Sequence, residues 1–442
     1  MKRIFPAYTY GSGPRNGCWW DETIAAPDWP VLTQPVKVDV AIIGGGFTGM
    51  SAAYHLAGAG TVVGLLEAET PGWGASGRNG GFCCLGGAKT SDAALERALG
   101  ADAARSYRAS EYAAVDLVDR LIETLGIDAD RHSRGETMLA HRPRDMERMK
   151  READEMLRHG GPEPTLIEAA DLPDHGMNAG FHGALTTPVG FALNPRKYLF
   201  GLAAAARSRG ARLYQNSPVA DLRREGRTWR LRTPRGSLDA DTVIIATNGY
   251  SSEDVPAWMA GRYLPSQSNV TVTRPLSEAE IAAQGWHSDQ MAYDTRNLLH
   301  YFRLMPDRRF LFGLRGGLLS SPAAEARARR RSRQDFERMF PAWKDVPSAH
   351  QWSGLVCRSR RRVPFVGAVP GQAGLFAGFA YHGNGVAMGS YAGRLLADLA
   401  LSVRSELPCS AAMSALPPRF PLGGVRRLLM PAAYLYYGLR DL

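Results

Sequence analysis

The sequence predicts a mixed α/β protein that combines a Rossmann-like domain with a second domain built on a mainly antiparallel sheet. Three observations predict this class. A strand, a glycine-rich turn, a helix and another strand follow one another at residues 38–67, as in the first unit of a Rossmann fold. A second glycine-rich strand–loop–helix occupies residues 374–401. Between them, residues 266–314 alternate strand signals with turns, which indicates hairpins.

The unit at residues 38–67 contains each part of a dinucleotide-binding fingerprint. The run Val40–Ile43 is apolar enough to be a strand buried on both faces. Gly44, Gly46 and Gly49 follow with the spacing G-x-G-x-x-G, and Glu67 ends the second strand about 20 residues later. A lone glycine motif is weak evidence, but strand, glycines, helix, strand and acid in this order form a specific signal.

Each of these residues has a mechanical reason. Gly44 allows a tight turn, Gly46 lets the backbone approach a pyrophosphate, and Gly49 lets the helix pack closely on the strand. The N-terminus of the helix offers free N–H groups and the positive end of its dipole to phosphates. Glu67 can accept hydrogen bonds from a ribose 2′-hydroxyl and would repel a 2′-phosphate. The unit therefore predicts NAD or FAD and leaves the choice open.

Composition and charge exclude several other classes. Hydrophobic residues make up 45% and charged residues 22% of the chain, as in ordinary globular proteins. The net charge of +10 suggests nucleic-acid binding at first, but only six of the 53 basic residues are lysine, a bias typical of GC-rich coding sequences. The densest basic run, Arg327–Arg333, lies in an apparent helix and is interpreted as a solvated face. We expect no nucleic-acid partner.

The cysteines and the apolar runs indicate a cytoplasmic protein. The five cysteines are scattered, with no ligand spacing, so neither a disulfide framework nor a metal site is expected. No stretch resembles a signal peptide, and no apolar run approaches the ~20 residues that cross a bilayer. We therefore expect reduced thiols and no transmembrane segment.

Two glycine-rich loops bear on the choice between NAD and FAD. Residues 71–82 follow the second strand directly and are nearly empty of helix and strand formers, which indicates a ligand-facing or a merely flexible loop. Residues 379–385 lead into a predicted helix from Val386 to Leu401. An NAD enzyme leaves both loops unexplained. In a flavoenzyme, a second helix N-terminus can stabilise the negative charge of reduced flavin, although a plain crossover connection is also compatible.

At this point the chain resembles a family. The segments GASGRNGGF, GFALNPRKYLFGLAAAA, NSPV, ATNGY, HYFRLMPDRRFLFG, VPFVG and AYHGNGVAMG occur in the order seen in FAD-dependent oxidoreductases of the D-amino-acid oxidase superfamily. They are most similar to its gamma-glutamylputrescine oxidoreductase-like branch. The resemblance covers roughly residues 19–442, and it implies the fold and an FAD cofactor.

The resemblance also implies cofactor contacts, residue by residue. The pyrophosphate and ribose are assigned to the first unit, the flavin to the loop after it and to the distant loop, and the adenine to a valine backbone. The residues concerned are Gly44, Gly46, Thr48, Gly49, Glu67, Ser76, Arg78, Asn79, Gly80, Val219, Gly383, Asn384, Gly385 and Val386.

The domain boundaries predicted with this resemblance are discontinuous. Residues 1–35 form an N-terminal arm with tryptophans as packing anchors. Residues 36–90, 185–262 and 350–405 form the FAD-binding domain, and residues 91–184 and 263–349 form the substrate domain. Residues 406–442 form a helical tail.

Three departures from relatives matter. Ala387 stands where sarcosine-oxidase-like relatives carry a lysine that holds the substrate carboxylate, which argues against a simple N-methyl amino acid. Cys357 lies a few positions too late to match the cysteine that links flavin covalently, so we expect non-covalent FAD. The run Arg358–Arg362 is interpreted as a solvated turn, with attraction of an acidic substrate as the alternative.

The expected reaction is oxidation of a C–N bond in an amine or amino acid, with a gamma-glutamyl polyamine as one candidate. Hydride passes to the flavin, and water hydrolyses the imine. Tyr301 and Arg303, which share one face of a strand, are candidates to line the substrate pocket, or else form a sheet-face ion pair. His382 is a third candidate, with a structural role as the alternative. The electron acceptor is oxygen, a quinone or a carrier. An NAD-dependent dehydrogenase and a non-catalytic flavoprotein with a nucleic-acid or assembly role remain alternatives.

Overall fold

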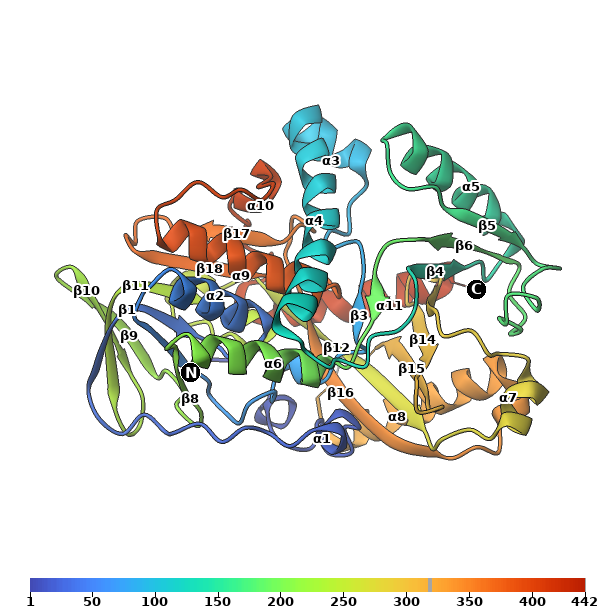
Figure 1. Cartoon of the computed structure of the whole chain (residues 1–442), viewed down its shortest axis with the longest axis horizontal. Helices are drawn as coiled ribbons and strands as arrows, with labels where there is room; N and C mark the ends of the chain where they lie inside the picture. Colours follow the sequence, from blue (N-terminus) through green and yellow to red (C-terminus); the bar gives the residue numbers. More distant parts are fainter. Residues whose placement is uncertain (317–319, 442) are drawn as a thin grey trace.

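The computed structural model describes residues 1–316 and 320–441; residues 317–319 and 442, in the predicted substrate domain and tail, lie outside the described residues. Within them, two eight-stranded sheets form the body and a two-stranded sheet joins β3 (Phe82–Cys83) to β7 (Phe191–Ala192). The first sheet lies on the left of Figure 1 and the second on the right. The predicted mixed α/β class is confirmed by this architecture and by the solved structures it resembles, described below.

The first sheet is Rossmann-like, with β1 (Val36–Ile43) at its centre. The strand order is β17-β18-β11-β1-β2-β8, and β18, β11, β1, β2 and β8 run parallel. A central parallel strand is covered on both faces, which is why the second half of β1 is uniformly apolar and buried. The other strands are β2 (Val63–Leu66), β8 (Arg212–Tyr214), β9 (Asp221–Glu225), β10 (Thr228–Arg232), β11 (Ser237–Ile245), β17 (Phe365–Ala368) and β18 (Leu375–Phe379).

Three helices cover one face of this sheet: α2 (Phe47–Gly58), α6 (Pro195–Ser208) and α9 (Ala387–Ala400). They lie stacked beside one another in Figure 1. Small residues let α2 and α9 approach closely, and the Ser51 hydroxyl donates to the Ser390 carbonyl at 2.7 Å. The start of α6 is capped as the sequence predicts, because the Asn194 side chain accepts from two backbone N–H groups and Pro195 takes the first helical position.

The second sheet is mainly antiparallel and has the order β16-β12-β15-β14-β13-β4-β6-β5. Only the contact between β13 and β4 is parallel among its described pairs. Its strands are β4 (Glu136–Leu139), β5 (Thr165–Glu168), β6 (Gly183–Thr187), β12 (Leu264–Thr273), β13 (Met291–Asp294), β14 (His300–Leu304), β15 (Phe310–Arg315) and β16 (Ser348–Arg358).

Two predicted domain boundaries differ from these sheets. The prediction assigns residues 185–262 and 350–405 to the FAD-binding domain. The strands β6 and β16, which extend into these ranges, both lie in the second sheet. The physical reason is the long antiparallel register between β16 and β12, which extends from Leu264 opposite Arg358 to Thr273 opposite Ser348. A pairing between strands so far apart in the chain leaves no local sequence signal.

The outer face of the second sheet packs on an aromatic core. Phe302 stacks on Phe312 with ring centroids 6.0 Å apart, and Phe340 packs on Phe310 at 4.7 Å. The helix α8 (Pro322–Met339) covers this face, and α7 (Glu278–Gln284) lies beside it (Figure 1). The arginine-rich segment predicted as a solvated helix face therefore belongs to α8, where Arg333 and Glu337 form an i, i+4 pair.

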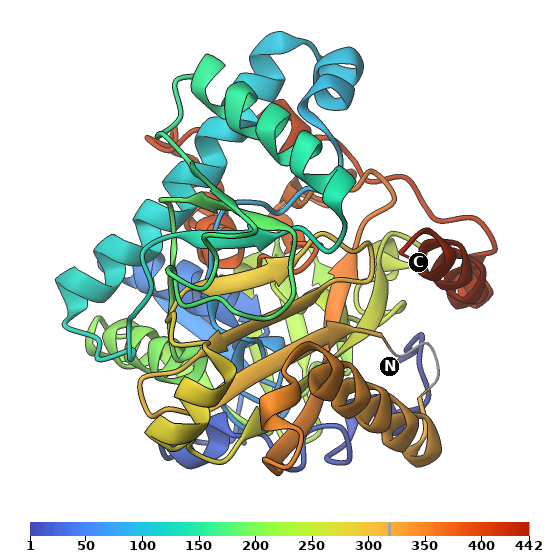
Figure 2. The same cartoon turned by 90° about the vertical axis from the view of Figure 1, so that its right-hand side faces the viewer.

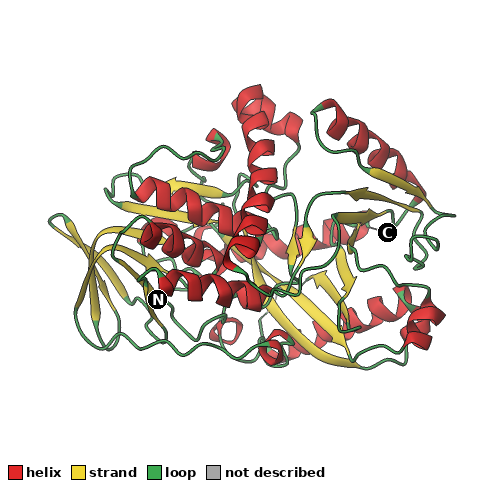
Figure 3. Cartoon of the chain, in the orientation of Figure 1, coloured by secondary structure: helices red, strands yellow, loops and turns green. Residues whose placement is uncertain are grey.

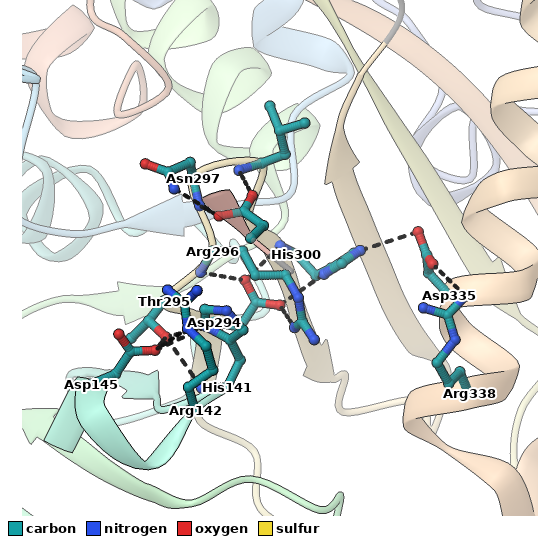
Figure 4. A network of polar contacts seen from close by, with 12 residues as sticks. His141, Arg142, Asp145, Asp294, Thr295, Arg296, Asn297, His300, Asp335 and Arg338 are labelled. Atoms are coloured by element: carbon teal, nitrogen blue, oxygen red, sulfur yellow. Dashed lines mark hydrogen bonds and ion pairs between the residues drawn. The ribbon is translucent and has the colours of Figure 1, made fainter. Parts of the chain in front are cut away.

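A buried polar network joins the second sheet to α8 (Figure 4). His300 lies between Asp294, 2.7 Å from its Nδ1, and Asp335, 3.3 Å from its Nε2. Burial lowers the pKa of His300, but the two carboxylates outweigh that effect and hold the pKa above its usual 6.5. Burial raises the pKa of Asp294, but the charges and hydrogen bonds of His300 and Arg296 together outweigh that effect and hold it below 3.8. The network is a buried cation held between two anions.

The remaining helices surround the two sheets. In Figure 3 the helices α3 (Asp92–Leu99) and α4 (Ala101–Leu125) rise between the sheets, and α5 (Pro143–Arg158) stands at one end. The short α1 (Trp20–Thr23) belongs to the N-terminal arm, in which Trp20 and Trp29 are buried. No described helix is long and apolar enough to span a bilayer.

The chain ends in a helix at the edge of the molecule. After α10 (Ala411–Ser414), a 3₁₀ segment (Gly423–Leu428) leads into α11 (Leu429–Arg440), which lies at the right-hand edge of Figure 2. Its carboxyl end is fastened to the second sheet, since the Asp441 carboxylate accepts from the backbone N–H groups of Asn297 and Leu298 at 2.8 and 2.9 Å.

Candidate active site

A large cavity connects the first sheet with the second. At one end it is lined by residues that follow β1 and β2, and at the other by the inner face of β12, β15, β14, β13 and β4. The loop after β2 and the loop before α9 form its sides. Ligands of open parallel sheets bind at the carboxyl ends of the strands, so the first of these ends is the expected place for a nucleotide.

The nucleotide end has the features predicted from the fingerprint. Gly44 adopts a φ of 109°, which a side chain would disfavour. A Cβ added to Gly49 would overlap the Gly44 carbonyl oxygen, so Gly49 packs the helix against the turn and does not line the cavity. The Glu67 carboxylate reaches the cavity and accepts the N–H groups of Gly45 and Glu69 at 2.8 and 3.0 Å. These bonds fix its orientation at the end of β2.

The loop after β2 is held by its own polar side chains. The Ser76 hydroxyl accepts the N–H of Phe47 at 3.0 Å, at the start of α2. The Asn79 side-chain carbonyl accepts the N–H of Gly81 at 2.8 Å. The indole N–H of Trp20, in the N-terminal arm, donates to the Asn79 backbone carbonyl at 2.8 Å. Arg78 donates through Nε to the Trp73 carbonyl, but its buried Nη2 has no hydrogen-bond partner in the described protein. An orphaned guanidinium nitrogen beside a cavity fits an anionic ligand such as a pyrophosphate.

The loop before α9 forms the opposite wall. Ala380, His382 and Gly383 have positive φ values of 68°, 52° and 114°, which turns the chain sharply into the helix. Asn384 donates to the Leu85 carbonyl at 2.6 Å and so ties this loop to the segment after β3. Thr48, Gly80, Val219, Gly383, Asn384, Gly385 and Val386 all line the cavity, as do Gly44, Gly46, Glu67, Ser76, Arg78 and Asn79.

His382 lines the cavity but uses both ring nitrogens within the protein. Its Nδ1 lies 2.7 Å from the Gly87 carbonyl, and its Nε2 accepts the N–H of Ser359 at 3.2 Å. Burial, with smaller effects from nearby cations, lowers its pKa to about 3. A neutral imidazole with both nitrogens engaged positions the loop and has no free site for proton transfer.

Of the two candidate substrate residues, Tyr301 lines the cavity and Arg303 does not. Tyr301 lines the cavity, packs over Gly80 and forms a hydrogen bond with the Ser268 hydroxyl at 3.1 Å. Arg303 is buried outside the cavity lining, where it donates to the carbonyls of Gly80 and Leu193 at 3.0 and 2.8 Å. Its third partner is the neutral ring of His132 at 2.8 Å. The substrate role expected for Arg303 has no geometric support, and neither has the sheet-face ion pair: the guanidinium supports the backbone at Gly80, in the loop after β2.

Sequence reasoning missed other polar residues that line the same cavity. One row of directly paired residues crosses the inner face of the sheet: Val270, Gly313, Tyr301, Tyr293 and Met138. Because side chains alternate along a strand, Arg315, two positions after Gly313, and Glu136, two positions before Met138, point to that face as well. Arg315, Glu136, Tyr293 and Lys89 all line the cavity. Only the register of the strands brings them together, and no local motif marks them.

Two cations, Arg315 and Lys89, line the cavity near the second sheet. The Arg315 guanidinium has a single long hydrogen bond, 3.4 Å to the His382 carbonyl, and within the described residues no carboxylate lies within 4 Å of it. Burial, and then the charge of Arg358, lower the pKa of Arg315 to about 10. Lys89 lines the same part of the cavity, and its side chain is exposed. This part of the cavity is therefore prepared for an anion.

Comparison with known proteins identifies the family of the chain. A family model described as DAO, FAD dependent oxidoreductase, matches residues 39–399. The chain belongs to this family. The predicted FAD-dependent oxidoreductase is confirmed at that level, and neither an NAD-dependent dehydrogenase nor a non-catalytic flavoprotein is favoured.

Relatives of this DAO-family chain cover nearly its whole length. Gamma-glutamylputrescine oxidoreductase of Escherichia coli is 30% identical over 413 residues, which are 93% of this chain and 94% of the relative. A probable oxidoreductase of Rhizobium meliloti is 33% identical over 430 residues, 96% of this chain and 97% of the relative. Glycine oxidase from Geobacillus kaustophilus has a similar structure, with a TM-score of 0.71 at 21% identity, covering 86% of this chain and 99% of that one.

Proposed function

We propose that this enzyme oxidises the C–N bond of an amine or amino acid that carries a carboxylate, with gamma-glutamyl polyamines as the first substrates to test. The observation that carries the proposal is the uncompensated Arg315 guanidinium on the inner face of the second sheet, in the cavity whose other end has the dinucleotide fingerprint. The name and full-length similarity of the Escherichia coli relative support the substrate class.

The residues at the nucleotide end would hold FAD, which supplies a hydride acceptor when bound. Glu67 would bind the ribose, the turn at Gly44 and Gly46 together with Arg78 the pyrophosphate, and the two loops the flavin. The N-termini of α2 and α9 place positive dipole ends beside the cavity, where they favour negative charge.

The protein's own groups bind and orient the substrate. Arg315 is suited to hold a carboxylate with two parallel N–H bonds. Tyr301 and Phe82, with ring centroids 5.5 Å apart, form an aromatic wall that excludes water near the reacting carbon. Because oxidation of an amine needs its neutral form, a water-poor pocket with a local positive charge lowers the amine's pKa and favours the reactive species.

The flavin is proposed to be bound without a covalent bond. Cys357 lines the cavity, but burial raises the pKa of its thiol to about 12, so the thiolate that would attack a flavin is scarce. Acid precipitation of the purified protein should release all of the flavin into the supernatant. Flavin that stays with the pellet in the wild type and leaves it in Cys357→Ser would overturn this assignment.

Two further features stay predictions. The electron acceptor is proposed to be oxygen or a quinone or carrier, and the compartment the cytoplasm. Oxygen consumption during turnover, compared with reduction of an artificial quinone, would identify the acceptor.

The central experiment is an anaerobic screen of amines and amino acids, including gamma-glutamylputrescine, against the FAD-loaded protein. Substrates should bleach the flavin absorbance, and the product should be an aldehyde or keto acid after imine hydrolysis. A protein that binds FAD but is not reduced by any member of the screen would contradict the proposed function.

A further inference from the structure

Glu136 is a buried carboxylate at the far end of the cavity from the nucleotide. It is the first residue of β4, its side chain borders the cavity, and only 9% of its surface is exposed. Among the described residues no ion pair within 4 Å involves Glu136. Burial raises its pKa to about 7, against the opposing effects of a hydrogen bond with the Cys84 thiol and of the charge of Lys89 farther away. A thiol is a weak donor and leaves most of the acceptor capacity of a carboxylate unused.

Other buried acids of this protein have strong partners. Asp294 pairs with His300 and Arg296, and Glu253 with Arg426. Glu67, a half-buried acid at the cavity, accepts two backbone N–H groups. A buried carboxylate without such partners is costly, and that cost is removed when a ligand supplies a cation.

The position of Glu136 relative to Arg315 sets the size of the ligand. Three strand spacings separate β15 from β4, and the two residues lie four positions apart along the strand direction. In a flat sheet these offsets place the two Cα atoms roughly 19 Å apart. The two side chains together are shorter than this separation, so their charged groups do not meet across the sheet. Lys89 lies close enough to both residues for their charges to act on its pKa: Arg315 lowers it and Glu136 raises it.

We propose that Glu136 forms a cation subsite, so that the substrate carries a carboxylate at one end and a protonated nitrogen at the other. Arg315 holds the carboxylate and Glu136 the distal ammonium, with a chain of several bonds between them. This inference rests on the proposed function, because it identifies the substrate class of the same cavity. It excludes glycine and other compact amino acids as best substrates, since their charges are too close together.

Matched ligands test the subsite. The probes are gamma-glutamylputrescine and gamma-glutamylbutylamide, in which a hydrogen replaces the distal ammonium. Lysine and norleucine form a second pair. Dissociation constants come from saturation of anaerobic flavin reduction for ligands that reduce the enzyme, and from titration of the flavin spectrum for those that do not.

In the wild type, the ligand with the distal ammonium should bind at least tenfold more tightly in one of the pairs. Glu136→Gln should bring this ratio close to one, and Glu136→Asp should restore part of it. Arg315→Met should weaken both members of a pair alike. Glu152→Gln, which changes a carboxylate paired with Arg148 on α5, serves as a folding control and should leave the ratio unchanged.

The outcomes separate the two proposals. If no amine or amino acid reduces the flavin, the proposed function fails. If reduction occurs but the wild-type ratio is below twofold in both pairs, or persists in Glu136→Gln, the cation subsite is wrong while the proposed function stands. Retained flavin content in each variant shows that a change in the ratio does not come from unfolding.

Discussion

The Thr48 hydroxyl lies 2.8 Å from the phenol oxygen of Tyr381, although 333 positions separate the two residues in the chain. Thr48 is in the first turn of α2, and Tyr381 is in the loop that precedes α9. Both side chains are buried. This hydrogen bond therefore joins the two helix starts that flank the cavity and fixes the spacing between the loops assigned to FAD.

Removing one partner of this bond should destabilise the protein. Tyr381→Phe leaves the buried Thr48 hydroxyl without its partner, and Thr48→Val does the same to the Tyr381 hydroxyl. We expect each variant to lose about 1–3 kcal/mol in the free energy of unfolding. The double variant should lose less than the sum of the two single variants. Urea unfolding measures all three, and strictly additive losses would show that the two hydroxyls are not coupled.

Gly49→Ala should prevent FAD binding. The new Cβ would overlap the Gly44 carbonyl, so α2 must move away from the turn that holds the pyrophosphate. We expect purified Gly49→Ala to be colourless or to retain less than about a tenth of the wild-type flavin. Gly424→Ala is the matched control, since nothing lies within 4 Å of a Cβ at that position. Normal flavin content in Gly49→Ala would contradict the close packing.

Arg315→Met should weaken binding of substrates that carry a carboxylate. Loss of charge-assisted hydrogen bonds is worth about 1.5–3 kcal/mol, which corresponds to a rise in KM of about 10- to 150-fold. An amine without a carboxylate should be affected far less. The matched control is Arg360→Met, an exposed arginine. A similar loss with both classes of substrate would indicate that Arg315 acts on the flavin or the fold.

Arg303→Met should behave differently from Arg315→Met. It removes three hydrogen bonds around Gly80 and leaves two carbonyls without their donor, so the Tm and flavin retention should fall. The KM of the fraction that keeps flavin should stay close to that of the wild type. A large rise in KM at normal Tm would return Arg303 to the substrate site.

Stability should depend on the charge of His300. Since the folded pKa of His300 lies above 6.5, the network stabilises the protein fully below pH 6.5 and less as the pH rises through the folded pKa. Asp294 acts in the opposite direction, because its pKa lies below 3.8 and its contribution is lost in acid. His300→Gln should cost about 1.5–3 kcal/mol at pH 6, because it removes charge-assisted hydrogen bonds from two carboxylates that keep their arginine partners Arg296, Arg331 and Arg338.

The check is the free energy of unfolding of the wild type and His300→Gln between pH 6 and 9. The difference between the two curves should shrink as the pH rises. A constant difference would mean that His300 is neutral in the folded protein and contributes through packing alone.

Local signals explain why part of the fold could be predicted from the sequence. The first βαβ unit is continuous, and its glycines, apolar strand and terminal acid each serve a local geometry, so they were found in place. The cap at Asn194 and Pro195 is local as well. The second sheet depends on pairings such as β16 with β12, and these rest on contacts between distant segments.

The same difference divides the candidate site. The predicted residues at the nucleotide end belong to motifs and line the cavity, except Gly49, which packs α2 against the turn. At the substrate end, Tyr301 lines the cavity while Arg303, two residues away on the same face of the strand, lies beyond its edge. Arg315 and Glu136 come from strands far apart in the chain. Which polar residue faces a ligand is decided by the register of the sheet and the position of a loop, and neither is encoded in a short stretch.

The two loops that flank the cavity also constrain the order of events during synthesis. Translation produces the turn at Gly44 early, but the opposite wall consists of residues 380–386, and β18 joins the first sheet only through β11. A nascent chain therefore lacks one wall of this cavity until residue 386 has left the ribosome. With FAD in the cavity as proposed, we expect loading to be late and any truncated product that ends before this loop to accumulate as an apoprotein.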